Sequence, residues 1–353
     1  MGQTDRKVLV ALSGGVDSAV CVQLLREQGF TVSALVLRFS DAHDKAVAAA
    51  RLAADQLGVP LTVRDCSDAF RREVIAPFCA EYCAGRTPNP CLVCNPRVKF
   101  RQLCEAADEM GIFFVASGHY ARIAQEGEVF FPRRAVSEAR DQSYMLYRLP
   151  QEMLRRLLLP VGEFEKPEIR RRAAALGLAA ASAPDSQEIC FIPDGDYPAY
   201  IERQGYHGAA GNFIAPDGTV LGPHKGVLRY TVGQRRGLGI ALGRPVFVRR
   251  ILPGGDILLG DAGEEFYAAV ALNDLIERGA GLVPGERYEV KIRSAAKPVP
   301  CRVLRRTPDG VILVFDAPAR APAPGQAAVL YRGDLVVGGG PICEIFSEVP
   351  DPE

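Results

Sequence analysis

The sequence of 353 residues lacks several features that mark large classes of protein. No stretch of 18 consecutive apolar residues occurs, so a membrane-spanning helix is not expected. The apolar run after Lys7 is too short for a secretory signal peptide, and we therefore expect a cytoplasmic protein. Lys and Arg together number 42, as do Asp and Glu, so the net charge provides no general attraction to nucleic acid.

The composition is that of a folded chain of moderate size. Apolar residues make up 48% and charged residues 24%, which is typical of globular proteins and excludes a wholly disordered chain. The length suggests two or three domains. Because a cytoplasmic compartment is reducing, the ten cysteines are expected to be free, metal-bound or catalytic, not a framework of disulfides.

The first 120 residues alternate the patterns of buried strands and helices. Strands are expected at 8–12, 31–37, 59–63 and 112–116, and helices at 17–28, 42–57 and about 97–110. Repeated strand–helix units predict an α/β fold with a doubly wound parallel sheet. Ligands of such sheets bind at the carboxyl ends of strands, so the loops after Leu12, Leu37 and Ala116 are the first candidates for a site.

The rest of the chain changes character twice. Residues 196–260 are rich in glycine, and from residue 261 apolar and polar residues alternate around the turn signal Pro308-Asp-Gly310. We expect a catalytic domain at 1–195, a small basic central domain at 196–260 and a C-terminal antiparallel β-barrel at 261–353. A helical, basic segment at 151–182 closes the first domain and could pack with the central one.

One stretch, from Gly218 to Gly255, contains no acidic residue. Its cations are interleaved with Tyr230 and Phe247, a pattern that favours contact with nucleic-acid phosphates. The seven cations are Lys225, Arg229, Arg235, Arg236, Arg244, Arg249 and Arg250.

The first expected strand runs into the loop Ser13-Gly-Gly-Val-Asp-Ser18 and then into a helix. Two glycines allow the backbone to approach a ligand closely, and a helix N-terminus favours phosphate. Asp17 is a candidate catalytic residue that could hold a Mg²⁺ ion between phosphates. The Walker sequence Gly-Lys-Ser/Thr and the dinucleotide spacing Gly-x-Gly-x-x-Gly are both absent. A glycine-rich turn without a ligand is the alternative.

Three cysteines lie in segments rich in turn residues, where functional residues concentrate. Cys91 and Cys94 form a Cys-x-x-Cys pair after Thr87-Pro-Asn-Pro90, and the third ends the segment Asp185-Ser-Gln-Glu-Ile-Cys190. The histidines without the spacing of metal ligands are expected at the surface: His43, His207 and His224.

These motifs occur in an order, along nearly the whole chain, that resembles the bacterial tRNA-specific 2-thiouridylases. The matching segments are 13–18, 85–90, 94–95, 99–100, 118–120, 141–144, 189–192, 230–239, 324–326 and 338–340. The resemblance implies an ATP pyrophosphatase-type first domain and a sulfurtransferase that uses ATP and Mg²⁺. It also implies adenylation of the C2 oxygen of the wobble uridine in tRNA, release of pyrophosphate, and replacement of that oxygen by sulfur with loss of AMP.

The resemblance assigns roles to individual residues. Cys94 matches the nucleophile and Cys190 the carrier of a persulfide, and these two would form a disulfide when sulfur is released. A cysteine desulfurase or a sulfur-relay protein would supply the sulfur. The positions matching the ATP site are Ala11, Leu12, Ser13, Gly14, Gly15, Val16, Asp17, Ser18, Leu37 and Gly118. The positions matching tRNA contacts are Asn89, Pro90, Cys91, His119, Arg140, Asp141, Gln142, Arg293, Ser294 and Gln326.

The sequence departs from the family at Cys91, where many members carry Asp. Cys91, Cys94 and Cys190 are therefore possible ligands of a 4Fe–4S cluster that would replace the persulfide cycle. A structural zinc site, or a passive Cys91 beside a persulfide site, remains an alternative. Three other functions remain open: an amidating ligase of the ATP pyrophosphatase type, a tRNA thiolase with another target base, and a non-catalytic tRNA- or metal-binding protein.

Overall fold

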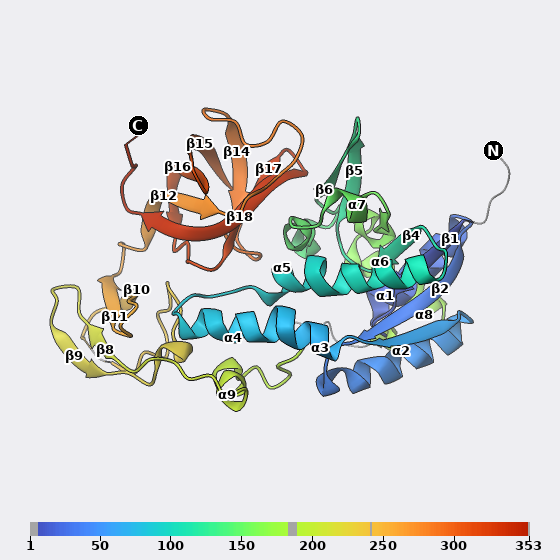
Figure 1. Ribbon diagram of the computed structural model, residues 1–353, viewed down its shortest axis with the longest axis horizontal. Helices are drawn as coiled ribbons and strands as arrows, with labels where there is room; N and C mark the ends of the chain where they lie inside the picture. Colours follow the sequence, from blue (N-terminus) through green and yellow to red (C-terminus); the bar gives the residue numbers. More distant parts are fainter. Residues whose placement is uncertain (1–5, 183–188, 241, 352–353) are drawn as a thin grey trace. The chain divides into compact units, whose positions relative to one another are not determined.

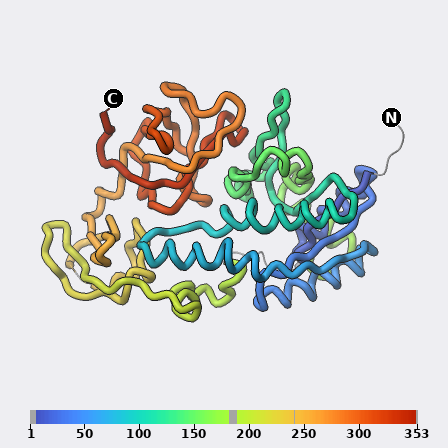
Figure 2. Tube along the Cα trace, in the orientation of Figure 1, coloured from blue at the N-terminus to red at the C-terminus, as the bar shows by residue number. Residues whose placement is uncertain are grey.

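The computed structural model describes residues 6–182, 189–240 and 242–351, which are the coloured segments of Figure 2. The chain forms two compact units, which are described separately. The first is made of Met1–Val74, Cys91–Gly195 and Asp334–Val336, and the second of Ile75–Pro90, Asp196–Gly333 and Val337–Glu353. The expected division at residue 260 stays a prediction.

The first unit is built on a parallel sheet, as the strand–helix alternation predicted (Figure 1). Its strand order is β3-β2-β1-β4-β7, and β1 pairs in parallel with both β2 and β4. The strands are β1 (Lys7–Ala11), β2 (Thr31–Arg38), β3 (Leu61–Asp65), β4 (Phe114–Ser117) and β7 (Leu157–Leu158). Because the strand order reverses between β1 and β4, a crevice forms beyond the carboxyl ends of these two strands.

Helices cover this sheet and complete its core. Helices α1 (Val16–Glu27) and α2 (Asp44–Leu57) follow β1 and β2, and α8 (Lys166–Ala175) packs on α1. The right-handed crossover rule places α6 (Phe100–Glu109), which precedes β4, on the opposite face. Apolar side chains from the sheet and from α1, α2 and α8 form one buried cluster, because these helices present their apolar faces to the strands.

Two parts of the first unit differ from the sequence expectation. A hairpin of β5 (Arg122–Glu126) and β6 (Val129–Arg133) was not predicted. The segment 151–182, expected to be helical, contains α7 (Gln151–Leu154) and α8 but also the short strand β7 between them. The first unit also contains α3 (Ser67–Phe70) and all of α5 (Pro90–Cys94) except Pro90, and the second unit contains α4 (Ala76–Cys83) and α9 (Tyr197–Arg203).

The second unit contains two small β-structures. The first is a sheet of order β10-β11-β8-β9, packed around Phe213, Tyr230 and Val248. Its strands are β8 (Asn212–Ile214), β9 (Val220–Pro223), β10 (Val246–Ile251) and β11 (Ile257–Asp261).

The C-terminal strands form the antiparallel barrel that the sequence predicted. They follow the order β12-β16-β15-β14-β17-β18, and pairing of β12 with β18 closes the ring. Thr307 pairs with Gly310, so Pro308 and Asp309 form the predicted hairpin turn. The strands are β12 (Phe266–Asn273), β13 (Ile276–Glu277), β14 (Arg287–Lys291), β15 (Val299–Thr307), β16 (Gly310–Arg320), β17 (Ala327–Arg332) and β18 (Leu335–Phe346).

Within the described ranges, the structure contains no helix that is both long enough and apolar enough to cross a membrane.

Candidate nucleotide and sulfur site

A cavity of about 450 Å³ lies at the carboxyl ends of β1 and β4, where the reversal of strand order predicts a ligand site. The loop between β1 and α1 forms one side of it, and Leu37 at the end of β2 forms another. Gly118, Lys166 and Cys190 also line it. Most of the positions that the resemblance assigns to ATP binding therefore line one cavity. Cys190, one of the two cysteines that the resemblance assigns to sulfur transfer, lines the same cavity.

Close packing and internal hydrogen bonds fix the loop between β1 and α1. Gly14 has a φ of +79°, and a Cβ atom there would lie 2.6 Å from the backbone of Ala49 and Ala50. The Ser18 hydroxyl accepts a hydrogen bond from the Ser13 amide at 3.2 Å and donates one to the Gly15 carbonyl at 3.0 Å. The loop is thus held in one conformation at the start of α1, whose first-turn amides have no acceptor within the helix.

Gly118 allows the loop after β4 to touch the loop after β1. A Cβ atom at this position would lie 2.6 Å from the Ser18 amide nitrogen and 2.7 Å from the Asp17 carbonyl carbon. Only glycine permits this approach, which accounts for its role in shaping the cavity.

Asp17 does not stand free in the cavity. The Lys166 ammonium donates to both carboxylate oxygens at 2.8 Å, and the Tyr120 hydroxyl donates to Oδ1 at 2.9 Å. Lys166 is only 7% exposed, although it lines the cavity. No local sequence motif marks Lys166 as a partner of Asp17, because 149 residues separate the two.

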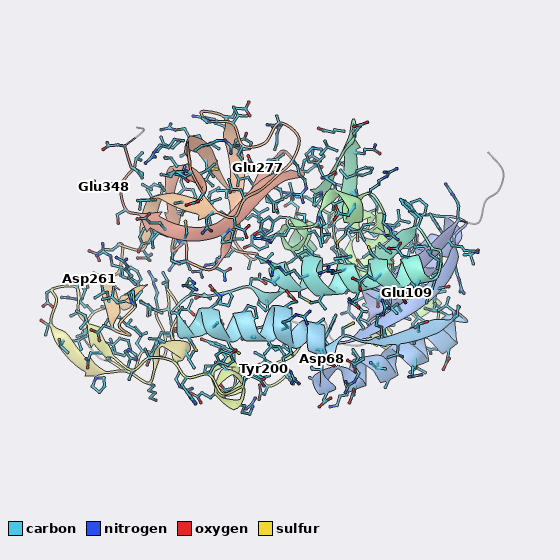
Figure 3. The ribbon with its side chains drawn as sticks, in the orientation of Figure 1. Asp68, Glu109, Tyr200, Asp261, Glu277 and Glu348 are labelled. Atoms are coloured by element: carbon cyan, nitrogen blue, oxygen red, sulfur yellow. The ribbon has the colours of Figure 1, made fainter. Side chains whose placement is uncertain are left out.

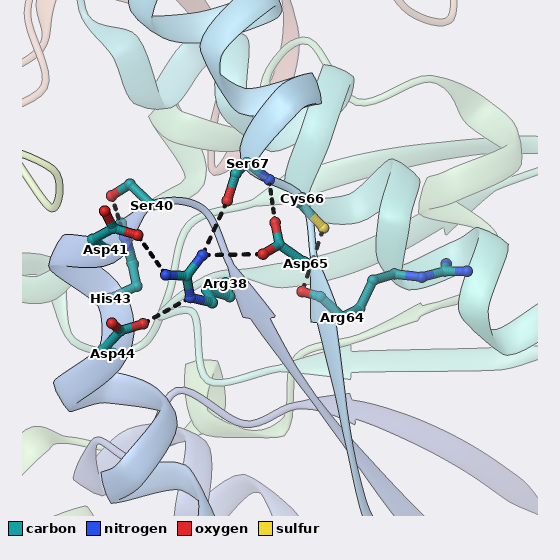
Figure 4. Close-up of polar contacts among 9 residues, drawn as sticks. All are labelled: Arg38, Ser40, Asp41, His43, Asp44, Arg64, Asp65, Cys66 and Ser67. Atoms are coloured by element: carbon teal, nitrogen blue, oxygen red, sulfur yellow. Dashed lines mark hydrogen bonds and ion pairs between the residues drawn. The ribbon is translucent and has the colours of Figure 1, made fainter.

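The segment after β2 is held by Arg38, whose guanidinium donates to Asp44 at 2.7 Å and to Asp65 at 3.0 Å (Figure 4). These contacts fix the turn that carries His43. His43 is 8% exposed and lines the cavity, so its expected surface position is wrong. Burial lowers its pKa, and the nearby positive charges of Lys99 and Arg38 lower it further.

A row of aromatic rings connects this segment with Cys190. Phe39 stacks on Phe70 with ring centroids 4.9 Å apart, and Phe70 meets Phe191 edge-on at 5.4 Å. Phe191 is buried, so it anchors the neighbouring Cys190 at the cavity. The residues Asp185–Glu188 of the same motif lie outside the described part of the chain.

The three cysteines singled out by the sequence interact electrostatically with one another. Burial raises the pKa of the Cys94 thiol to about 12, and negative charge on Cys190 or Cys91 raises it further. Cys190 as a whole is exposed, but its thiol is shielded from water, and this burial raises the pKa of the Cys190 thiol to about 11. The positive charge of Lys99 opposes both shifts, and the Lys99 amide donates a hydrogen bond to Cys94.

No disulfide joins any of the ten cysteines, all of which lie in described segments. The same described segments contain no group of three or more His, Cys, Asp or Glu side chains arranged to hold a metal ion. The described structure therefore does not arrange Cys91, Cys94 and Cys190 as a metal site, and the 4Fe–4S cluster stays a prediction. Asp17 as a Mg²⁺ ligand also stays a prediction, since its oxygens accept from Lys166.

Several predicted tRNA contacts in the first unit have internal partners. The Asp141 carboxylate accepts from the Ala135 and Ser143 amides, both at 3.1 Å, and the Gln142 side-chain oxygen Oε1 accepts from the Tyr120 backbone amide at 2.8 Å. His119 lies 2.8 Å through Nδ1 from the Ser117 hydroxyl, and burial lowers its pKa well below the usual value. His119, Arg140 and Gln142 line the cavity.

The remaining predicted tRNA contacts belong to the second unit, apart from Cys91. The Arg293 guanidinium donates to the Ala321 carbonyl at 2.8 Å, and the Gln326 amide donates to the Thr87 carbonyl at 2.7 Å. Both side chains thus stabilise their own unit. The others placed there are Asn89, Pro90 and Ser294.

The stretch without acidic residues in the sequence is not free of acids in space. Four of its arginines form ion pairs with acidic residues from outside the stretch. The pairs are Arg229–Glu202, Arg235–Glu265, Arg244–Asp261 and Arg249–Glu264, and Figure 3 labels Asp261 on β11. Within the described segments, the cations of this stretch without an acidic partner are Lys225, Arg236 and Arg250. The basic surface is therefore smaller than the sequence suggested.

The parallel sheet, the glycine-containing loop and the cavity at the strand reversal define an α/β protein with a nucleotide-type site. Residues 6–194 match the family model of the tRNA methyl transferase HUP domain. Residues 200–259 match the tRNA methyl transferase PRC-barrel domain, and 283–342 the aminomethyltransferase beta-barrel domain.

Known proteins similar to the whole chain narrow the class to a family. The tRNA-specific 2-thiouridylase MnmA of Carboxydothermus hydrogenoformans is 44% identical over 96% of this chain and 97% of that one. The MnmA of Clostridioides difficile is 39% identical over 95% and 98%. A solved 4-thiouridine synthetase–RNA complex has a TM-score of only 0.34 at 17% identity, covering 56% of this chain and 50% of that one. The chain belongs to the family of tRNA-specific 2-thiouridylases.

Proposed function

We propose that this protein is an ATP-dependent tRNA sulfurtransferase that replaces the C2 oxygen of the wobble uridine by sulfur. The observation that carries the proposal is the shared cavity, which joins the loop between β1 and α1 to Cys190. Phosphates favour the amides of such a loop, and a thiol beside them is suited to carry sulfur. The relatives' name specifies thiolation, whereas the family model's description specifies methyl transfer; the cysteine set supports thiolation.

In the proposed first step, the uridine C2 oxygen attacks the α-phosphorus of ATP. The bond from that phosphorus to the bridging oxygen breaks, and pyrophosphate leaves. The C2 oxygen now carries AMP, which is a far better leaving group than oxide. The loop residues Ser13–Ser18 would orient the phosphates, and Leu37 and Gly118 would contact the rest of the nucleotide.

In the proposed second step, the terminal sulfur of a Cys190 persulfide attacks C2, and AMP leaves with the original oxygen. The Cys94 thiolate then attacks Cys190 Sγ and breaks the sulfur–sulfur bond, which leaves sulfur on C2 and a Cys94–Cys190 disulfide. A dithiol reductant must restore both thiols, and a cysteine desulfurase or a relay protein must reload Cys190. We place this chemistry in the cytoplasm.

A 4Fe–4S cluster, if bound, would be held by Cys91, Cys94 and Cys190 and would supply sulfide at an open iron. Because the described side chains do not form a metal site, we derive no step through it. Iron and acid-labile sulfide measured on protein purified without oxygen distinguish the two routes. Near-stoichiometric amounts lost in Cys91→Asp would favour the cluster, whereas active protein without iron would favour the persulfide.

The proposal is tested with unmodified tRNA, ATP, Mg²⁺, a dithiol reductant and a cysteine desulfurase with cysteine, without S-adenosylmethionine. We expect 2-thiouridine, AMP and pyrophosphate in equal amounts. Cys94→Ser and Cys190→Ser should each abolish thiolation while tRNA binding survives. Cys343→Ser, which changes an exposed thiol on β18, is the matched control and should keep full activity.

Two outcomes would overturn the proposal. Pyrophosphate release without any thiolated nucleoside would favour an amidating ligase of the ATP pyrophosphatase type. A thiolated nucleoside other than 2-thiouridine would show a different target base. Retained thiolation in Cys94→Ser or Cys190→Ser would refute the roles given to those residues.

A further inference from the structure

Lys166 is a buried cation in a cavity whose proposed ligand carries several negative charges. It is the first residue of α8, is 7% exposed, and lines the same cavity as the loop between β1 and α1. Its ammonium contacts both Asp17 oxygens at 2.8 Å and lies 5.6 Å from the centroid of the Tyr120 ring. None of the expectations from the sequence or from the family resemblance gives it a role.

A purely structural role explains this pair poorly. Removing two charges from water costs free energy that their attraction only partly returns, so apolar residues would attach α8 to the loop at least as well. The charges also face a cavity instead of closing a core contact. A charged pair beside a ligand site is more readily explained by a ligand that needs one of its charges.

The positions of the other cavity cations support this choice. Lys99 interacts electrostatically with Cys94, Cys190 and His119, so its charge serves the sulfur side of the cavity. Arg140 is exposed, at the end of the turn Glu138–Arg140. Lys166, in contrast, is hydrogen-bonded to Asp17 on the loop where phosphates are expected.

We propose that Lys166 is the residue that binds the terminal phosphates of ATP, and that Asp17 positions its ammonium and does not act as a metal ligand. The inference rests on the proposed use of ATP. The four-carbon side chain of lysine is flexible and carries three donors, so the ammonium can pass from the carboxylate to phosphate oxygens. The charge it offers there also stabilises the pyrophosphate that leaves.

The test compares the binding of ATP and AMP by titration calorimetry in wild type, Lys166→Met and Lys166→Arg. Met keeps the length of the side chain without its charge, and Arg keeps the charge. We expect Lys166→Met to weaken ATP binding about 10- to 100-fold, the range for a charge-assisted hydrogen bond, and to leave AMP binding unchanged. Lys166→Arg should recover part of the preference for ATP. Lys45→Met, at an exposed position of α2, is the matched control.

A merely structural Lys166 predicts a different pattern. ATP and AMP would then weaken together, or neither would change, and a folded Lys166→Met that keeps the wild-type ratio of the two affinities overturns the inference. If wild type binds no ATP at all, the proposed function fails instead.

Asp17→Asn keeps the inference testable even if Lys166→Met does not fold. Since Asp17→Asn keeps the Lys166 charge and weakens only the contact that positions it, the preference for ATP over AMP should fall by no more than about threefold, and equally with Mg²⁺ or with a chelator. Loss of that preference only in the presence of Mg²⁺ would show that Asp17 acts through a metal ion and would overturn the assignment.

Discussion

Gly118→Ala tests whether the contact between the loops after β1 and β4 shapes the nucleotide cavity. The added Cβ would lie 2.6 Å from the Ser18 nitrogen, about 0.8 Å closer than the 3.4 Å at which ordinary contact begins. Its neighbours are backbone atoms, so one loop must move. Overpacking of this kind costs about 1–3 kcal/mol, which lowers the melting temperature by about 2–4 °C per kcal/mol in a unit of this size.

The same displacement moves the Asp17–Ser18 backbone, so ATP affinity should fall with stability. Thermal unfolding and calorimetric titration with ATP measure the two effects. Gly254→Ala is the matched control, because a Cβ there would meet nothing within 4 Å. A folded Gly118→Ala variant with wild-type melting temperature and ATP affinity would refute the argument that this contact is required.

Three further predictions concern thiols and cations. The rate of Cys190 alkylation should rise about tenfold per pH unit between pH 7 and 10, because the pKa of its thiol is about 11. Mass spectrometry of the labelled peptide measures this rate, and a rate that stops rising below pH 9 would contradict the raised pKa. Burial raises the pKa of Cys301 from 9.0 to about 12, so the stability it contributes is complete below pH 9 and declines at higher pH by up to about 1.4 kcal/mol per unit. Cys301→Ala should therefore show a shallower alkaline fall in the free energy of unfolding. When the cations of residues 218–255 that lack an acidic partner in the described segments are replaced together by alanine, tRNA should bind more weakly, and its affinity should depend less on salt concentration. An unchanged salt dependence would contradict contact of these cations with phosphates. These cations are Lys225, Arg236 and Arg250.

The sequence predicted those parts of the fold that local patterns determine. The alternation of apolar strands and glycine-ended helices up to Ser117 defined the parallel sheet, because each element carries its own periodicity. The loop Ser13–Ser18 was recognisable for the same reason. The hairpin β5–β6 was missed, although Gly127, with a φ of +60°, marks its turn.

Long-range pairs were beyond local patterns. Nothing near Asp17 in the sequence points to Lys166, and nothing near His43 indicates that Arg38 holds its turn against Asp65. The acid-free stretch misled for a related reason. Glu264 and Glu265 lie about ten residues beyond this stretch in the sequence, but in the folded chain they form ion pairs with Arg249 and Arg235. Charge patterns along a chain therefore define a surface only after the partners in space are known.

The different exposure of the two proposed sulfur residues supports their order of action. Cys190 is exposed and lines the cavity, so a donor protein and a nucleotide-bound substrate can each reach it. Cys94 is 6% exposed, so an outside sulfur donor has little access to its thiol. A thiol of this kind is suited to attack only a neighbour inside the protein. The proposed loading on Cys190 and resolution by Cys94 agree with this difference in exposure, whereas the reverse order would require a donor to reach a buried thiol.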